Sequence, residues 1–491
     1  MGMIAITRFL TVCSQNLKQE AYASNFYFSE EKIYLNIPGI KKNEIYEMEI
    51  SGMNHEGQGV GRIEGFTVFV DGAIPGETVH VRIIELKKNY AVGTLIKIIK
   101  PAPCRVTPFC KDFERCGGCS LQHMNYQAQL KLKAEIVGED IKRIGKLAGV
   151  IIHDTIGMAN PFRYRNKVQF PVGISDGKPV MGFYAKRSHE IVGNRFCSIQ
   201  DKDSDLIRDM FLKFLKDFKI SIYDEKTGKG LIRHLMVRKG FKTGEVMVVI
   251  VVNGNDLPHK VKLIERLKAA VAGIRSIYLN INTRNTNIIL GEKNIKIYGH
   301  DTITDFIGRF RFEISPLSFF QVNPAQTEVL YRKALEYAHL KGNETVFDLY
   351  CGIGTISLFL SEKAGKVYGI EVVEDAVEDA KKNAAANGVH NVEFITGEVA
   401  KVIPGMHEKG ISADVAVVDP PRKGCDEVVL ETLVKMQPER IVYVSCNPST
   451  LARDLNYLAE RGYMPVEVQP VDMFPFTSHV ECVVLMSRVK N

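Results

Sequence analysis

The sequence predicts an α/β protein in which a small β-barrel and an α+β central domain precede a doubly wound parallel sheet. Three observations support this prediction. Short glycine-punctuated strands fill residues 46–99, strands and charged helices mix in the middle, and strand and helix alternate over the last third. A chain of 491 residues, 45% hydrophobic and 25% charged, has the composition of a soluble globular protein of roughly three domains.

The predicted boundaries follow these changes of pattern. Residues 1–41 show no clear periodicity and are expected to form an N-terminal extension, to which no function is assigned. Residues 42–100 are expected to form the barrel, because alternating strands at 67–70 and 77–83 are separated by glycines. Residues 101–310 are expected to form the central domain and residues 311–491 the doubly wound domain.

Composition indicates where the protein works. No apolar run approaches the roughly 20 residues of a membrane-spanning helix, and the first residues lack a secretory signal, so a cytoplasmic protein without a membrane partner is expected. Ten cysteines are then better interpreted as reduced thiols, metal ligands or catalysts than as disulfides. The net charge of +7 permits an anionic polymer as partner, and no obligate protein partner is inferred.

The elements after the barrel are predicted in order. A proline-rich break at 101–103 precedes four cysteines between 104 and 119 and a helix from 126 to 147. Central strands are expected at 245–252 and 276–281. Buried β-branched strands recur at the interval of a parallel sheet, and they are expected at 345–350, 366–371, 392–396, 413–419 and 440–446.

A glycine-rich turn follows the first of these strands. Gly352 and Gly354 open a helix at the edge where such sheets bind nucleotides. Glu371 ends the next strand, about 20 residues on, where a carboxylate can accept from ribose hydroxyls. The dinucleotide pattern needs a third glycine, and Ser357 stands there instead. S-adenosylmethionine, which carries ribose but no phosphate, therefore fits better than a dinucleotide.

Cys446 is the candidate nucleophile. Asn447 is a good N-cap and Pro448 suits the first helical position, so the thiol is expected at a helix N-terminus, which lowers a thiol pKa. Arg422 follows the paired prolines after Asp419, where methylases of exocyclic amines carry an aromatic residue, so a carbon target is favoured. C5 of uracil is too weak a nucleophile unaided, and a thiolate adding to C6 would activate it.

Loss of the C5 proton then requires a base. Glu481 is the preferred candidate, and His479 is the alternative because its ordinary pKa is nearer neutrality.

Four segments resemble, in order, the motifs of the RNA 5-methyluridine (uracil-C5) methyltransferases that use S-adenosylmethionine. They are Phe347-Asp-Leu-Tyr-Cys-Gly-Ile-Gly-Thr355, Asp419-Pro-Pro-Arg-Lys-Gly424, Ser445-Cys-Asn-Pro448 and His479-Val-Glu-Cys482. The resemblance covers about residue 42 to the end and implies a Rossmann-like methyltransferase domain. It implies that Cys446 is the nucleophile and Glu481 the base. It also implies cofactor contacts at Tyr350, Glu371 and Asp419, with Gln321 in the same site.

The same resemblance gives the cysteines a role. Cys110, Cys116 and Cys119, spaced C-x5-C-x2-C, together with Cys197 resemble the four ligands of the [4Fe-4S] cluster found in some members. Spacing alone leaves zinc as an equal alternative, because four thiolates suit either. Cys104 lies outside the pattern.

Two further features concern RNA. The glycine-rich barrel resembles a TRAM domain, an RNA-binding barrel of the oligonucleotide-binding type. Arg163-Tyr-Arg-Asn-Lys167 interleaves cations with an aromatic residue, and Arg233-His234 adds a second basic pair, so both are candidate RNA contacts.

The leading hypothesis is methylation of C5 of a specific uridine in RNA. The barrel and the cysteine set resemble the branch that modifies 23S ribosomal RNA, with transfer RNA as the alternative substrate. A hypothesis of another class is a non-catalytic RNA-binding protein with a redox-sensing cluster.

Overall fold

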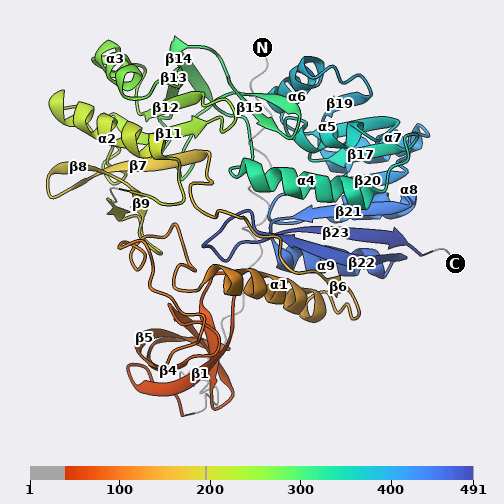
Figure 1. The fold of residues 1–491 in the computed structure, drawn as a ribbon, viewed down its shortest axis with the longest axis horizontal. Helices are drawn as coiled ribbons and strands as arrows, with labels where there is room; N and C mark the ends of the chain where they lie inside the picture. The colour runs from red at the N-terminus through yellow and green to blue at the C-terminus, as the bar shows by residue number, and fades with distance from the viewer. Residues whose placement is uncertain (1–38, 194–195, 490–491) are drawn as a thin grey trace, which may run out of the picture.

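The computed structural model describes residues 39–193 and 196–489, so nearly all of the predicted extension lies outside the described residues. Residues 45–100 form a closed five-stranded barrel with the strand order β1-β2-β3-β5-β4 (Figure 1). Its strands are β1 (Ile45–Met53), β2 (Gly59–Ile63), β3 (Phe66–Asp71), β4 (Thr78–Leu86) and β5 (Tyr90–Lys100). Alternate residues such as Val79 and Val81 fill the interior, and a Cβ at Gly93 would lie 2.1 Å from Val81. The predicted oligonucleotide-binding type of barrel is confirmed.

Helix α1 (Tyr126–Arg143) links the barrel to the C-terminal sheet. Its N-cap Asn125 accepts a hydrogen bond from the Ala128 amide. Val137 and Ile141 of α1 share one apolar core with α9 (Pro448–Ala459), and β6 (Ile151–Ile152) pairs with β22 (Tyr463–Val471). Helix α1 and strand β6 belong to the sequence range predicted as the central domain, yet they pack on the C-terminal sheet.

The central sheet has the strand order β14-β13-β12-β11-β7-β8. Its strands are β7 (Lys167–Ser175), β8 (Lys178–Met181), β11 (Ile232–Lys239), β12 (Val246–Val252), β13 (Ile274–Ile281) and β14 (Lys293–Gly299). Helices α2 (Lys202–Asp217) and α3 (Lys260–Ala270) cover one face, and a short pair, β9 (Phe183–Tyr184) and β10 (Ile191–Val192), lies beside β8. The opposite face packs on the hairpin of β15 (Ile303–Ile307) and β16 (Phe310–Ile314).

The C-terminal sheet has the order β19-β18-β17-β20-β21-β23-β22-β6. Its remaining strands are β17 (Thr345–Leu349), β18 (Lys366–Glu371), β19 (Val392–Thr396), β20 (Val415–Val418), β21 (Arg440–Ser445) and β23 (Glu481–Arg488). The first five of these are parallel and β23 is antiparallel, which confirms the predicted doubly wound sheet. From β17 the chain runs outward on one side through β18 and β19 and then crosses to β20 on the other side of β17. A switch point of this kind in the strand order opens a ligand crevice.

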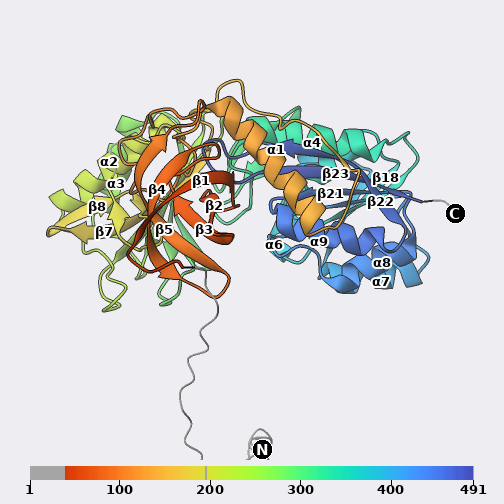
Figure 2. The same cartoon turned by 90° about the horizontal axis from the view of Figure 1, so that it is seen from below.

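Helices cover both faces of this sheet because alternate strand residues point to opposite sides. The helices α4 (Pro324–Ala338), α5 (Thr355–Ser361) and α6 (Glu374–Ala386) pack on one face. On the other face lie α1, α9, α7 (Val399–Glu408) and α8 (Glu427–Met436). Figure 2 shows the barrel on the side of the central sheet, with α1 running from it across the C-terminal sheet. None of the described helices is long and apolar enough to cross a membrane.

Candidate active site

The loop between β17 and α5 forms the floor of the crevice. Tyr350, Gly352 and Gly354 have positive φ values of 69°, 54° and 82°. A Cβ at Gly354 would lie 2.7 Å from the Phe394 ring, so this position combines left-handed backbone with close packing. Burial raises the pKa of Tyr350, whose hydroxyl lies beside Cys425. Only glycine therefore fits position 354 without strain, which keeps the turn at the start of α5 tight.

Glu371 stands at the end of β18 with its carboxylate fixed toward this loop. It accepts hydrogen bonds from the amides of Gly352 at 3.1 Å, Val372 at 2.8 Å and Val373 at 2.9 Å. The side chain is partly buried, and free lone pairs remain on a carboxylate with three donors. This is the position in which an acid can accept from ribose hydroxyls, as the sequence predicts.

Asp348 is a site residue that the sequence reasoning missed. Its side chain is fully buried at the end of β17, Oδ2 accepts from the Ser357 hydroxyl at 2.5 Å, and Oδ1 has no partner among the described residues. Burial raises its pKa to about 7, and Asp419 and Glu371 contribute in the same direction. Ser357, where a third glycine is missing, thus serves to hold Asp348. An acid inside an otherwise apolar strand was the available signal.

Acidic residues gather at this edge of the sheet. Burial raises the pKa of Asp419, just after β20, to about 6. Glu481 begins β23, and because β23 is antiparallel its first residue lies at the same edge. Burial raises the pKa of Glu481 well above its ordinary value; Asp419 adds to this shift and Arg422 opposes it. With Asp348 and Glu371, these carboxylates form a cluster at the edge of the sheet that favours a cationic ligand.

Cys446 lies between β21 and α9 and is partly buried. The predicted capping is confirmed: the side chain of Asn447 accepts from the Ser449 amide at 3.1 Å, and Pro448 opens the helix. The predicted lowering of the thiol pKa is wrong for this structure. Burial raises the pKa of Cys446 to about 11, Glu481 and Asp419 add to the shift, and Arg422 opposes it. Desolvation and two nearby carboxylates outweigh the helix N-terminus.

The candidate bases differ in their relation to this thiol. Ser445 at the end of β21 pairs with Cys482 of β23, and Glu481 is the neighbouring residue of β23, so Cys446 and Glu481 both adjoin the last residue pair of these two strands. His479 lies two residues earlier, in the loop that lines the neighbouring cleft, with its ring 6.1 Å from that of Phe474. The strand pairing therefore brings Cys446 and Glu481 together more directly than Cys446 and His479.

Gln321 lies in the loop before α4, nearly fully buried. Its backbone oxygen accepts from the Asn166 side chain at 3.0 Å, and the oxygen of Val322 accepts from the Asn166 amide at 2.8 Å. These bonds tie the loop to the start of β7. The central sheet thus helps to position a residue that the resemblance assigns to the site.

A cleft of about 740 Å³ lies between the central sheet and this edge of the C-terminal sheet. Arg165 and Lys167 line it from the central side, and Arg422 and His479 from the C-terminal side. The remaining residues of the predicted RNA segment are structural: Arg163 bonds to Asp205, and the Tyr164 hydroxyl donates to the oxygen of Pro475. A cation-lined cleft therefore lies beside this edge of the C-terminal sheet.

The other predicted basic pair lies elsewhere. Arg233 donates to the oxygens of Asn282 and Arg284 and packs on the ring of Tyr223, with its guanidinium carbon 4.4 Å from the ring centroid. His234 lines a separate cavity with Arg233, and neither lines the cleft beside Cys446. The structure therefore separates this pair from the candidate active site.

All four cysteines of the predicted ligand set line the cleft: Cys110, Cys116, Cys119 and Cys197. Burial raises the pKa of Cys119 to about 12, and the neighbouring cysteines contribute to that shift. Four thiols facing one space are a donor set that suits an iron–sulfur cluster or zinc. Within residues 39–193 and 196–489, however, no three Cys, His, Asp or Glu side chains form a group that could hold a metal ion.

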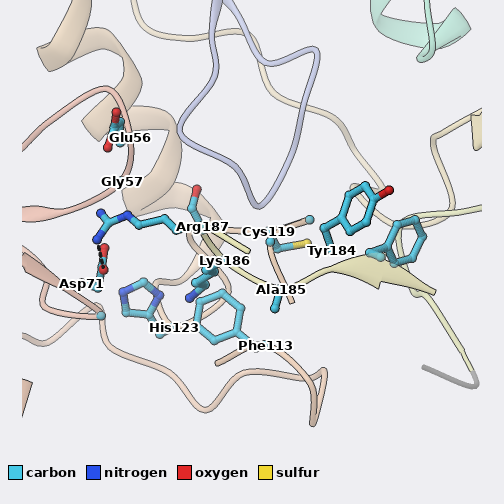
Figure 3. A pocket seen from close by; sticks show the side chains of 15 residues that line it. Glu56, Gly57, Asp71, Phe113, Cys119, His123, Tyr184, Ala185, Lys186 and Arg187 are labelled. Carbon is cyan, nitrogen blue, oxygen red and sulfur yellow. Dashed lines mark ion pairs between the residues drawn. The ribbon is translucent and has the colours of Figure 1, made fainter. Parts of the chain in front are cut away.

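A second cavity of about 500 Å³ opens between the barrel and the cysteine segment (Figure 3). Arg187 pairs with Asp71 of the barrel at 3.3 Å across it. His123 lies beside Phe113, with the ring centroids 5.2 Å apart, and both of its ring nitrogens lack a partner in the described part of the chain. Residues 117–120 of the cysteine segment and Glu56 of the barrel line both cavities, so the two cavities are neighbours.

Comparisons with known proteins agree with this architecture. The family described as tRNA (uracil-5-)-methyltransferase matches residues 259–489, and the TRAM domain matches residues 41–96. An uncharacterized RNA methyltransferase of Clostridium tetani is 54% identical over 448 residues, which are 91% of this chain and 97% of that protein. One from Caldanaerobacter subterraneus is 56% identical over 450 residues, 92% of this chain and 99% of its own.

A solved structure shows the same fold over most of its length. The Pyrococcus abyssi tRNA (uracil-54, C5)-methyltransferase, in complex with S-adenosyl-L-homocysteine, superposes with a TM-score of 0.72 at 29% identity, covering 90% of this chain and 100% of that one. The chain therefore belongs to the RNA methyltransferases, with residues 259–489 matching the tRNA (uracil-5-)-methyltransferase family and residues 41–96 matching the TRAM domain.

Proposed function

We propose that this enzyme transfers a methyl group from S-adenosylmethionine to C5 of a specific uridine in RNA, through a covalent bond between Cys446 and C6 of the uracil. The observation that carries the proposal is the position of Cys446. It directly follows the last residue pair of β21 and β23, next to Glu481, where Glu481, Asp419 and Arg422 all act electrostatically on its thiol.

The carboxylate cluster suits the cofactor. S-adenosylmethionine supplies a methyl group on a sulfonium cation, and Asp348, Asp419 and Glu481 favour positive charge at this edge. In the proposal Glu371 accepts from the ribose hydroxyls, the backbone of Gly352 and Gly354 allows close approach, and Tyr350, Asp419 and Gln321 complete the contacts. The relative solved with S-adenosyl-L-homocysteine supports this assignment.

The chemistry then uses this chain's own groups. The Cys446 thiolate adds to C6 of the uracil, and the electron pair of the 5,6 double bond becomes an enolate with density on C5. C5 takes the methyl group, Glu481 removes the C5 proton, and the returning electron pair expels the Cys446 sulfur. The raised pKa of Glu481 makes its carboxylate a stronger base than an exposed glutamate. A bound cation would offset the carboxylates beside Cys446 and so lower the pKa of its thiol.

The proposed substrate is 23S ribosomal RNA, with transfer RNA as the alternative. The TRAM domain and the four cysteines of the cleft support the first. The relative from P. abyssi, described as acting on uracil-54 of transfer RNA, favours the second. The cations Arg165, Lys167 and Arg422 provide a surface for the phosphates of either RNA, from which the target base must be flipped toward Cys446.

We further propose that Cys110, Cys116, Cys119 and Cys197 hold a [4Fe-4S] cluster with a structural role, zinc being the alternative. Support comes from four thiols that line one space. The adjoining segment is also tied to the loop before Glu481, because the amides of Ser120 and Leu121 donate to the Phe476 oxygen at 2.9 and 3.0 Å. A visible absorption band that dithionite bleaches is the expected result, and a metal analysis that finds zinc alone would refute the cluster.

The function is tested with labelled S-adenosylmethionine and undermodified ribosomal or transfer RNA. We expect 5-methyluridine in one RNA class, and a covalent adduct through Cys446 when the target carries 5-fluorouridine. Cys446→Ala should lose turnover and adduct while it still binds RNA. Cys104→Ala is the matched control, because that thiol packs outside the cleft. Absence of product on every RNA would instead favour a non-catalytic RNA-binding protein with a redox-sensing cluster.

A further inference from the structure

Two neighbouring strands of the central sheet place a pair of cations side by side. Lys167 on β7 is the direct cross-strand partner of Arg238 on β11. The neighbouring cross-strand pair, Val168 and Val237, points into the core under α2 and α3, so Lys167 and Arg238 share the opposite face. Directly opposed side chains in an antiparallel pair lie close together, and like charges there are destabilising.

Neither cation is neutralised by a carboxylate of the described chain. Arg238 is only 5% exposed; its Nη2 donates to the Ser318 oxygen, and its Nε has no hydrogen-bond partner within residues 39–193 and 196–489. Lys167 is partly buried and lines the cleft, with no ion pair to any described residue. The next residue of β11 differs: Lys239 bonds to Asp201 at 2.9 Å and to Asp203 at 2.6 Å.

The surroundings add further positive charge. Arg165 lines the same cleft two residues before Lys167, and Arg422 lines it from the C-terminal side. Burial lowers the pKa of Lys167 to about 8, with Arg238 and Arg165 contributing in the same direction. A cluster of this kind is relieved by an anion with several acceptor oxygens, which can take donors from both a lysine and an arginine.

We propose that Lys167, backed by the buried charge of Arg238, forms a subsite for one phosphodiester group of the RNA strand that carries the target uridine. The inference rests on the proposed function, because Lys167 and Arg422 line one cleft and Arg422 acts electrostatically on Cys446. A phosphate held at Lys167 lies in the cleft that Arg422 lines from the C-terminal side. The subsite thus fixes the backbone beside a nucleotide that has left the stack.

The test compares neutral and charged variants at one position. Lys167→Met removes the charge and keeps most of the side-chain length, and Lys167→Arg keeps the charge. Lys178→Met is the control, because Lys178 is an exposed lysine of the next strand that does not line the cleft. Binding of the RNA class that the wild type methylates is measured across salt concentrations, together with binding of S-adenosylmethionine, binding of inorganic phosphate and the melting temperature.

Loss of one phosphate contact lowers the slope of log affinity against log salt by about 1 and the affinity about fivefold at 0.15 M salt. We expect this for Lys167→Met, with near-normal binding by Lys167→Arg and the control. The melting temperature of Lys167→Met should equal or exceed that of the wild type, because a like-charge repulsion is removed. If Lys167→Met does unfold, Lys167→Gln provides a second neutral variant.

Two results would overturn the subsite. One is an unchanged RNA affinity and salt slope in a folded Lys167→Met. The other is a loss confined to S-adenosylmethionine or to inorganic phosphate, which would identify a cofactor-carboxylate or small-anion site. These failures are distinct from failure of the proposed function. If no RNA receives 5-methyluridine and Lys167→Met still lowers the salt slope for a bound RNA, the subsite stands without the chemistry.

Discussion

Replacing Asp348 by asparagine tests the electrostatics of the candidate cofactor pocket. The carboxyl group is fully buried, and its Oδ1 has no hydrogen-bond partner in the described structure. Burial raises its pKa from 3.8 to about 7, so between these values the folded state binds protons that the unfolded state has released. Stability contributed by this site therefore falls as pH rises from 3.8 through 7. Asparagine has nearly the same shape and no charge to desolvate.

The magnitude follows from the two pKa values. A shift of one pKa unit corresponds to about 1.4 kcal/mol, so the linkage relation gives a cost of about 2 kcal/mol at pH 5 and about 4 kcal/mol at pH 8. The unfolding free energy of Asp348→Asn relative to wild type should therefore rise by about 2–3 kcal/mol between these pH values. Effects of the substitution that do not depend on pH cancel in this difference.

The assay is urea unfolding of the full chain at both pH values. Circular dichroism is the suitable probe because the chain contains no tryptophan. Asp154→Asn, a change of an exposed aspartate, is the control and should show no such pH dependence. Affinity for S-adenosylmethionine should fall about tenfold in Asp348→Asn, since one negative charge near the cation is lost. An equal stability difference at pH 5 and pH 8 would refute this account of Asp348.

Two other substitutions probe the backbone and the support of the site. Gly354→Ala should destabilise the protein by about 1–2 kcal/mol and weaken cofactor binding, because φ is 82° and the new Cβ would meet the Phe394 ring. Gly405→Ala is the control, because the space around Gly405 is open. It should show neither the loss of stability, measured by calorimetry, nor the loss of cofactor affinity, measured by titration. Lys133→Met should cost about 3 kcal/mol or more, because it leaves Asp472 buried without its ion-pair partner. The double variant with Asp472→Asn should recover part of that loss, and an additive loss in urea unfolding would contradict the pairing.

Local pattern was sufficient for much of the fold and for several site positions. The alternation of strand and helix, the glycines at 352 and 354 and the cap at Asn447 all depend on residues near one another in the chain. Periodicity, backbone conformation and capping are local properties, so these features are confirmed where they were predicted. Glu371 likewise lies at the end of the strand that carries it in the sequence.

Other features depended on neighbours that are distant in the chain. Helix α1 packs with α9, which lies about 300 residues later in the chain. Burial, Glu481 and Asp419 together raise the pKa of the Cys446 thiol, against the effect of the helix that follows it. The sequence shows an acid at position 348 in an apolar strand, but its full burial and an Oδ1 without a partner among the described residues are tertiary features. Sequence periodicity assigns a residue to a strand or helix, whereas desolvation and charge interactions depend on what the folded chain brings within a few ångströms. The sequence by itself therefore determined the elements and the candidate reactive groups, and the tertiary structure decided the electrostatic environment of those groups.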